Sequence, residues 1–168
     1  MLKLTLSERR LTSWSQTPND ERNAEISPNG RWVAYEANNQ PQSNQFNVYV
    51  RPFAMPSARL MELSTSGGRQ PVWSHDGTEL FFIGSEGALY SAQFNAENGV
   101  AEPPRQILPG GYYRSGRPGV FAVRMYDVAK DGRFLMMKDA VADLSTDRTR
   151  IVVTLNWLEE LKRLVPSK

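Results

Sequence analysis

The feature that most constrains this sequence is a short motif that occurs three times. Each copy leads from one apolar segment through a turn ending in Asn-Gly or Asp-Gly into a second apolar segment. These pairs favour tight hairpins because Asn, Asp and Gly tolerate a positive φ. The turn glycines Gly30, Gly77 and Gly132 lie 47 (77 − 30) and 55 (132 − 77) residues apart. The repeat therefore predicts a chain built from similar antiparallel β-sheet units.

Further strands are expected around each hairpin. A third strand is predicted at 46–53, 89–94 and 150–157, and a fourth at 59–63 and 105–108. Turn-rich connectors such as 38–44, 64–68 and 95–99 separate them. A four-stranded antiparallel meander with this period is typical of a β-propeller blade. We therefore expect an all-β domain over 1–168, with blades at 23–64, 70–109 and 120–157.

The two ends of the chain depart from the repeat. Residues 3–6 and 11–15 alternate around the polar turn 7–10, which predicts the outer hairpin of a partial blade within 1–16. At the other end, Asn156 and Glu159 have the spacing of a capping box, and Pro166 follows an amphipathic stretch. This pattern predicts a short terminal helix over 157–165.

The turn motifs also resemble those of a known family. Ser27-Pro28-Asn29-Gly30, Ser74-His75-Asp76-Gly77 and Ala129-Lys130-Asp131-Gly132 are similar to the repeat of TolB-type, WD-like β-propellers. The resemblance spans about residues 17–157, and the order of the segments resembles the C-terminal blades of bacterial propeller proteins such as receptor-like Ser/Thr kinase sensors. It implies a non-catalytic module for protein–protein or ligand binding, as a fragment or stand-alone derivative of a larger propeller. The alternative is an accessory propeller domain of a hydrolase, peptidase or sensor kinase.

Residue content limits the chemistry that the chain could carry. The sequence has no cysteine and a single histidine, which excludes thiol nucleophiles and the Cys-based metal sites. His75 lies in a turn where the other repeats have Pro28 and Lys130, so we expect it to be exposed. We therefore predict no enzymatic activity, no metal and no cofactor. A weak calcium site at Asp139, Asp143 and Asp147 is the one alternative left open.

One connector has the composition of a recognition loop. Residues 109–119 place two tyrosines and two arginines among glycines, and these residue types are enriched at binding hot spots. We predict that this loop binds a ligand or partner, on the same face as 38–44 and 139–147. The alternative is that its tyrosines pack on neighbouring sheets. The candidate site residues are Tyr112, Tyr113, Arg114 and Arg117.

The net charge of the chain and the number of predicted blades indicate which binding partners to expect. A net charge of +2 with scattered basic residues predicts no nucleic-acid binding, and no apolar run is long enough for membrane insertion. Three blades are fewer than the four or more that close a propeller, so Trp14 and Trp157 would face water in a free arc. We therefore expect self-association as a dimer of half-propellers, or completion by the remainder of a longer chain. The compartment stays open: cytoplasmic if Met1 is a native start, extracytoplasmic if the chain is cut from a larger parent.

Overall fold

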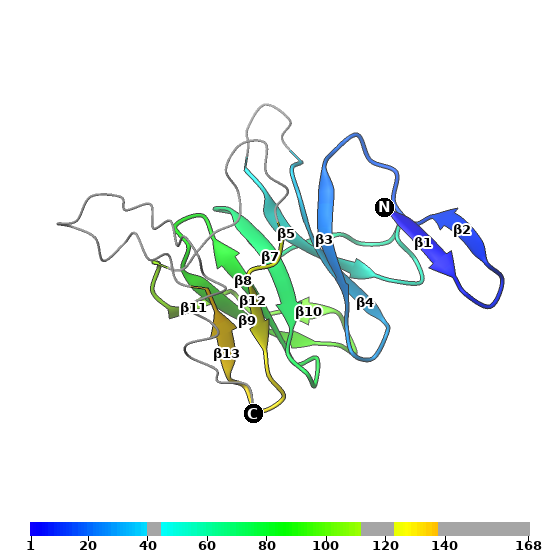
Figure 1. The fold of residues 1–168 in the computed structure, drawn as a ribbon. Helices are drawn as coiled ribbons and strands as arrows, with labels where there is room; N and C mark the ends of the chain where they lie inside the picture. The colour runs from blue at the N-terminus through cyan, green and yellow to red at the C-terminus, as the bar shows by residue number, and fades with distance from the viewer. Residues whose placement is uncertain (40–44, 112–122, 138–168) are drawn as a thin grey trace, which may run out of the picture.

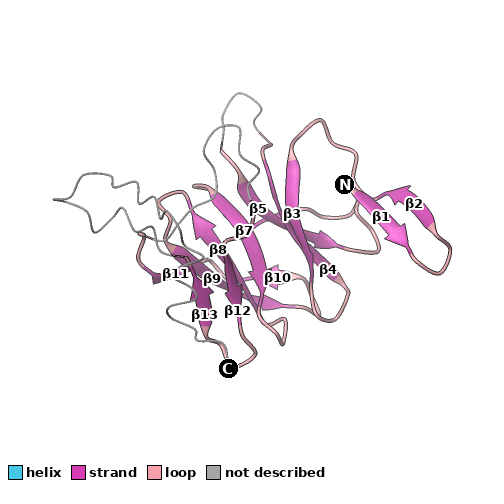
Figure 2. Ribbon diagram, in the orientation of Figure 1, coloured by secondary structure: helices cyan, strands magenta, loops and turns pink. Residues whose placement is uncertain are grey.

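The regular structure is entirely β in the computed structural model, which describes residues 1–39, 45–111 and 123–137 (Figures 1 and 2). Within these ranges, no helix is long and apolar enough to cross a membrane. The strands are β1 (Leu2–Thr5), β2 (Arg10–Ser13), β3 (Glu21–Ile26), β4 (Trp32–Ala37), β5 (Asn47–Pro52), β6 (Met61–Glu62), β7 (Gly68–Trp73), β8 (Glu79–Gly84), β9 (Leu89–Asn95), β10 (Val100–Ala101), β11 (Arg105–Leu108), β12 (Tyr126–Val128) and β13 (Phe134–Met136).

The first sheet has the predicted meander topology. Its order is β3-β4-β5-β6 with every pair antiparallel, and Tyr35 lies opposite Tyr49 in the β4–β5 pair. The N-terminal hairpin β1–β2 is also confirmed, with Leu4 opposite Leu11.

The second sheet contains the predicted fourth strand, β11 at Arg105–Leu108, and one short strand that was not predicted, β10. The order is β7-β8-β9, and the next position is divided between β10 and β11, which both pair with β9. Pro103 and Pro104 separate these two short strands. Proline has no N–H to donate to a sheet ladder, so β10 and β11 do not join into one strand.

The third unit is described as the hairpin β12–β13, with Val128 opposite Phe134. The strand predicted at 150–157 and the helix predicted at 157–165 lie outside the described residues.

The repeated turns share one hydrogen-bond pattern. The Ser74 hydroxyl donates to the Asp76 carboxylate at 2.6 Å and accepts from the Glu79 N–H at 2.9 Å. Asp76 also accepts from the Thr78 N–H and hydroxyl, and these bonds, led by the one from Ser74, lower the pKa of its carboxyl to about 2. Ser27 and Asn29 make the matching bonds in the first sheet. In these two turns the motif closes the hairpin through its side chains as well as its backbone. The third turn has Ala129 at the serine position and keeps the bond from the Arg133 N–H to Asp131, at 3.2 Å.

Neighbouring sheets pack face to face through apolar side chains. Ala34, Val48 and Val50 of the first sheet pack against Trp73, Leu80, Phe82, Ala92 and Phe94 of the second. On its other face the second sheet packs against the third, through Val72, Phe81, Ile83 and Leu89 against Tyr126, with Phe134 at the margin. Bulky strand residues therefore fill the space between the sheets at these positions.

The outer face of the first sheet is covered by Trp14. This indole is buried against Tyr35 and Phe53, and its Nε1 donates to the Phe53 carbonyl at 2.8 Å. The expectation that Trp14 faces water in a free arc is therefore wrong. The segment after β2 folds back over the sheet, which removes the indole from solvent without a further sheet. Trp157 lies outside the described residues.

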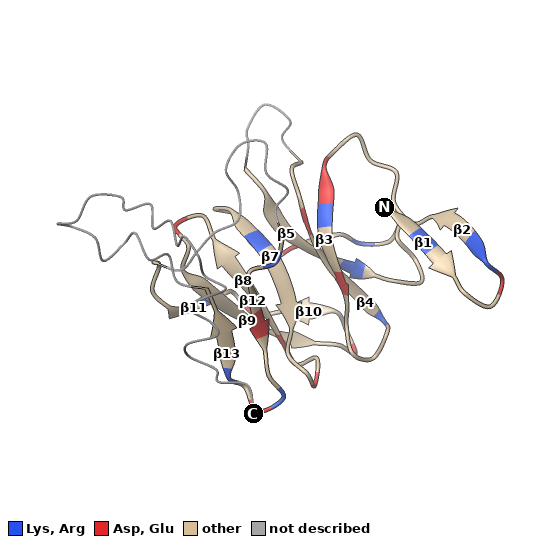
Figure 3. Ribbon diagram, viewed as in Figure 1, with Lys and Arg blue, Asp and Glu red and all other residues tan. Residues whose placement is uncertain are grey.

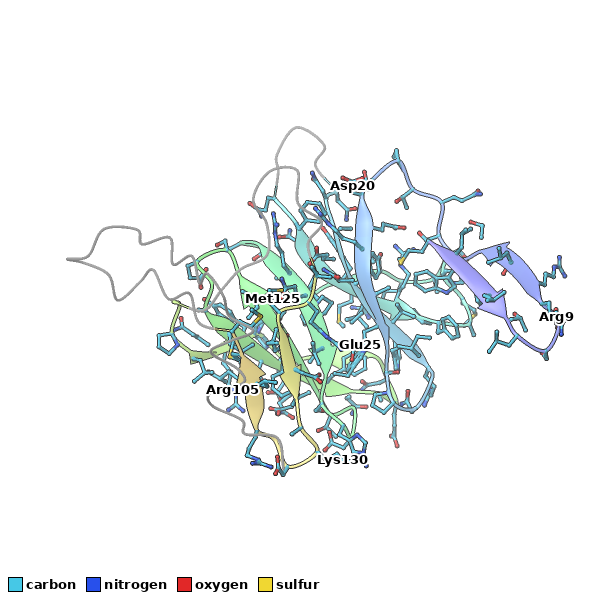
Figure 4. The ribbon with its side chains drawn as sticks, in the orientation of Figure 1. Arg9, Asp20, Glu25, Arg105, Met125 and Lys130 are labelled. Carbon is cyan, nitrogen blue, oxygen red and sulfur yellow. The ribbon has the colours of Figure 1, made fainter. Side chains whose placement is uncertain are left out.

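A chain of buried hydrogen bonds joins the three sheets. The Glu36 carboxylate in β4 accepts from the Gln70 N–H in β7 at 2.6 Å. The side-chain oxygen of Gln70 accepts from the Met125 N–H at 3.1 Å, and the backbone carbonyl of Gln70 accepts from the Tyr126 hydroxyl at 2.8 Å. Met125 is labelled in Figure 4. Gln70 has φ 56° within a bulge of β7, and Asn23 has φ 49° within the matching bulge of β3. The bulge in β7 thus points the Gln70 N–H out of its own sheet and toward Glu36 in the first sheet.

The turn glycines provide a test of the repeat. Gly132 has φ +80° and open space where a Cβ would lie, so Gly132→Val isolates the cost of a β-branched residue in the left-handed region. We expect it to reduce the free energy of unfolding by about 1–2 kcal/mol, and Gly77→Val at φ +74° to do at least as much. Chemical denaturation measures this. Gly132→Asn and His75→Ala, an exposed turn residue, should stay within about ±0.5 kcal/mol of wild type, and a large loss in either would contradict the assignment.

The buried carboxylate predicts a pH dependence. Burial raises the pKa of the Glu36 carboxyl, against the opposing hydrogen bonds from Gln70 and Asn23 and the charge of Arg22. Between pH 4.5 and the raised pKa, the folded state keeps the Glu36 proton that the unfolded chain has lost. The free energy of unfolding therefore falls as the pH rises through this interval. Glu36→Gln keeps an oxygen acceptor for the Gln70 N–H but does not titrate. Its free energy of unfolding should therefore rise relative to that of wild type as the pH increases across this interval.

Glu36→Ala is the matched contrast, because it leaves the buried Gln70 N–H without its acceptor. We expect this variant to lose about 1–3 kcal/mol at every pH. Denaturation of the three proteins between pH 4 and pH 8 gives both results. A constant difference between wild type and Glu36→Gln would show that Glu36 does not hold a raised pKa.

Candidate binding site

The strand register defines two opposite ends of the sheets. The β3–β4, β7–β8 and β12–β13 turns lie at one end, at the bottom of Figure 1. The β6–β7 connection and the β8–β9 turn lie at the other end, where Gly68 is opposite Gly84. We call the surface formed by 63–68, 84–88 and 109–111 the loop face. It is the face on which the sequence places the predicted recognition loop.

A pocket of about 240 Å³ opens on the loop face. The β6–β7 connection forms one wall, with Ser64, Ser66 and Gly67, and the β8–β9 hairpin forms another, with Phe82, Glu86 and Tyr90. The pocket therefore lies where the chain leaves the first sheet and enters the second.

Glycines create the room in this pocket. A Cβ on Gly68 would overlap the Ser64 hydroxyl, and a Cβ on Gly84 would lie 2.7 Å from the Tyr90 ring. Gly67 has φ +94°, which a side chain would strain. The Ser64 hydroxyl is held by the Val48 N–H, which donates to it at 2.8 Å. The wall is thus fixed by backbone contacts before any ligand is present.

Aromatic and polar groups meet on the opposite wall. The Phe82 and Tyr90 rings are stacked with centroids 5.4 Å apart and planes inclined by 10°. The Glu86 carboxylate accepts hydrogen bonds from the Tyr90 and Ser85 hydroxyls. The bond to Glu86 raises the pKa of the Tyr90 phenol, because a nearby carboxylate disfavours the phenolate. The pocket offers an apolar ring surface with hydroxyls and a carboxylate at its rim.

The size of the pocket and the residues that line it favour binding of a group as small as one amino-acid side chain. Sites for drug-sized ligands measure about 300–1,000 Å³, so this pocket suits one protein side chain better than a large cofactor. In residues 1–39, 45–111 and 123–137, no group of three or more His, Cys, Asp or Glu side chains could hold a metal ion. Figure 3 shows basic and acidic residues interspersed over the described strands.

The predicted recognition residues Tyr112, Tyr113, Arg114 and Arg117 lie outside the described residues, as do Asp139, Asp143 and Asp147. The start of their connector is described. A Cβ on Gly110 would lie 2.7 Å from the Glu86 carbonyl, so the connector leaves β11 against the pocket wall. His75 is exposed in its turn at the opposite end, as predicted.

Sequence reasoning missed the pocket itself. Phe82, Glu86 and Tyr90 are not among the site residues that the sequence predicts. The available signal was the concentration of glycines at 67 and 68, where β7 begins, and at 84 and 87, where β8 ends. Glycine inside or beside a strand marks a close approach of backbone or side chain.

The sequence matches neither a protein-family model nor a curated protein. The class of this protein is therefore defined by its fold and its pocket. The class that they support is an all-β protein of antiparallel sheets stacked face to face.

The Tyr90–Glu86 pair allows a direct test of the pocket wall. We expect the Tyr90 phenol to titrate above the ordinary value of 10.0, and Glu86→Gln to bring it back toward that value by removing the negative charge. NMR titration of the tyrosine ring carbons measures both. Ser66→Ala, on the facing wall, is the control and should leave the titration unchanged. An ordinary pKa in wild type would mean that the pair does not form.

Proposed function

We propose that this chain is a TolB-type β-propeller module that binds a protein or ligand and carries no catalytic activity. The support is the repetition of one unit: antiparallel sheets with similar turns, stacked through their apolar faces, with bulges at matching positions of β3 and β7. Blades of a propeller are related in this way. On this proposal the three sheets form an arc, completed by a second copy or by the remainder of a longer chain.

The observation that carries a binding role is the pocket between the first and second sheets on the loop face. Its volume suits one side chain of a protein partner. The connector with Tyr112, Tyr113, Arg114 and Arg117 begins against its wall at Gly110. Pocket and connector together would make one recognition surface, in which a partner side chain enters the pocket and the connector contacts the surrounding segment.

A displayed random-peptide library provides the probe for this function. Peptides selected on the wild-type chain should lose at least tenfold in affinity toward Ser66→Trp, which places an indole at the pocket. They should lose a similar amount toward Tyr113→Ala/Arg114→Ala, while the melting temperature stays almost unchanged. Isothermal calorimetry with one synthetic peptide measures the affinities.

His75→Trp is the matched control, because it adds the same bulk to an exposed position at the opposite end of the sheets. It should bind the peptide as wild type does. Equal binding to wild type, Ser66→Trp and the double variant would contradict the proposed surface. A fall in melting temperature of the double variant would show that its side chains pack on neighbouring sheets instead.

A further inference from the structure

The N-terminal hairpin has the same hydrogen bonds as the outer half of the first sheet. The N–H groups of the two residues after β2 donate to the Met1 carbonyl, at 3.0 and 3.2 Å. Those of the two residues after β6 donate to the Val48 carbonyl, at 2.8 and 3.4 Å. The next residue, Leu2 in β1 or Tyr49 in β5, lies opposite the last residue of the paired strand. β1 therefore corresponds to β5, and β2 to β6.

The residues that follow the two outer strands also correspond in their packing. Leu63 follows β6 and is buried between the first and second sheets. Trp14 follows β2 and is buried against Tyr35 of the first sheet. The hairpin, at the margin of the row of strands in Figure 1, is thus placed beside the first sheet as the outer half of that sheet is placed beside the second.

β1 differs from β5 at its other edge. β5 pairs there with β4 over six residues, whereas no strand within residues 1–39, 45–111 and 123–137 pairs with that edge of β1. Hydrogen-bonding direction alternates along a strand, so the bonds to the Met1 carbonyl place the N–H and C=O groups of Leu2 and Leu4 on this edge. We call it the open edge of β1. Such an edge is a template for a further strand.

The side chains beside the open edge are apolar. Leu2 and Leu4 are 71% and 54% exposed, and Leu11 of β2 is 63% exposed on the same face of the hairpin. Proline and outward charges block many natural sheet edges, but β1 has no proline, and the Lys3 ammonium lies on the other face, 5.9 Å from the centre of the Phe53 ring. A hairpin of two strands is marginally stable in water, so it gains from a third.

We propose that the open edge of β1 is a binding site for an antiparallel strand of a partner polypeptide. The inference rests on the proposed propeller unit, in which β4 is the second strand and β5 the third. In that unit, Val33 and Tyr35 lie opposite the β5 residues that correspond to Leu4 and Leu2, and both are buried and apolar. The partner strand therefore bonds through its backbone and presents apolar side chains at alternate positions to the leucines.

The pairing pattern of the described strands favours another chain as the source of this strand. Every described pairing joins strands that are consecutive in the chain, apart from that of β9 with β11. β1 is already paired with its consecutive strand, β2. Pairing of the open edge with a later segment of the same chain would depart from this pattern, so we assign the edge to a partner.

A synthetic peptide with the sequence of residues 30–38, which contains β4, serves as the partner strand. The bond from the Phe53 N–H to the Arg31 carbonyl shows that the N–H groups of Val33 and Tyr35 face β5, because this direction alternates along β4. The same peptide with N-methyl groups on these two nitrogens cannot make the corresponding bonds. It is the matched control.

Amide hydrogen exchange of the intact chain, measured by NMR, tests the pairing. In the free chain the Leu4 N–H should exchange faster than the Lys3 and Thr5 N–H groups, which face β2. The peptide should slow exchange at Leu4 by about tenfold or more, as expected for one new hydrogen bond. The N-methylated peptide should leave it unchanged.

Leu4→Pro and Leu11→Pro are a matched pair of variants. Each removes a leucine from the same face and an N–H that is not directed at the paired strand, but Leu4 lies on the open edge of β1 and Leu11 on the opposite edge of the hairpin. By calorimetry, Leu4→Pro should bind the peptide about tenfold more weakly than wild type does. Leu11→Pro should stay within about twofold. If Leu4→Pro fails to fold, the N-methylated peptide gives the same test on the wild-type chain.

Several results would overturn the proposal. The first is equal binding of the two peptides, or no binding of the unmodified one. The second is a Leu4 N–H already protected in the free chain: protection at every concentration would assign the edge to the rest of the same chain, and protection that rises with concentration would assign it to a second copy. Affinity of Leu4→Pro for a loop-face peptide reports separately on the proposed function, which stands if that affinity equals that of wild type.

Discussion

The buried hydrogen bond from the Gln70 N–H to the Glu36 carboxylate is the interaction on which the arrangement of the sheets depends. Apolar faces hold sheets together but allow them to slide, because hydrophobic contact has no direction. A carboxylate that is fully buried needs a donor at a fixed position, so it selects one alignment of β4 on β7. Gln70 also accepts hydrogen bonds from Met125 and Tyr126, and these bonds fix the third sheet relative to the second.

The loop-face pocket follows from the same alignment. Once β4 is fixed against β7, the β6–β7 connection must cross from one sheet to the next beside the β8–β9 hairpin. Gly68 and Gly84 face each other at that crossing and supply no side chains, so the space remains open between Ser64 and Tyr90. The pocket is thus a product of how two sheets are joined, and it lies at the end of the strands where connections can vary without disturbing the core.

The ends of the row show how a stack of sheets is terminated. Trp14 covers the first sheet by folding the chain back over Tyr35, which needs no further sheet. On β13, Leu135 and Met137 stay exposed in the part of the chain that the structure describes.

The sequence by itself determined the local elements. Asn29-Gly30 and Asp76-Gly77 specify hairpins through residues that are neighbours in the chain, and alternating apolar residues specify which side of each strand is buried. Even the exposed position of His75 follows from the turn alone. Only the tertiary structure decided that Trp14 is buried and that Glu36 meets Gln70. These outcomes depend on side chains separated by many residues, whose meeting is set by the alignment of whole sheets, and no local pattern encodes that alignment.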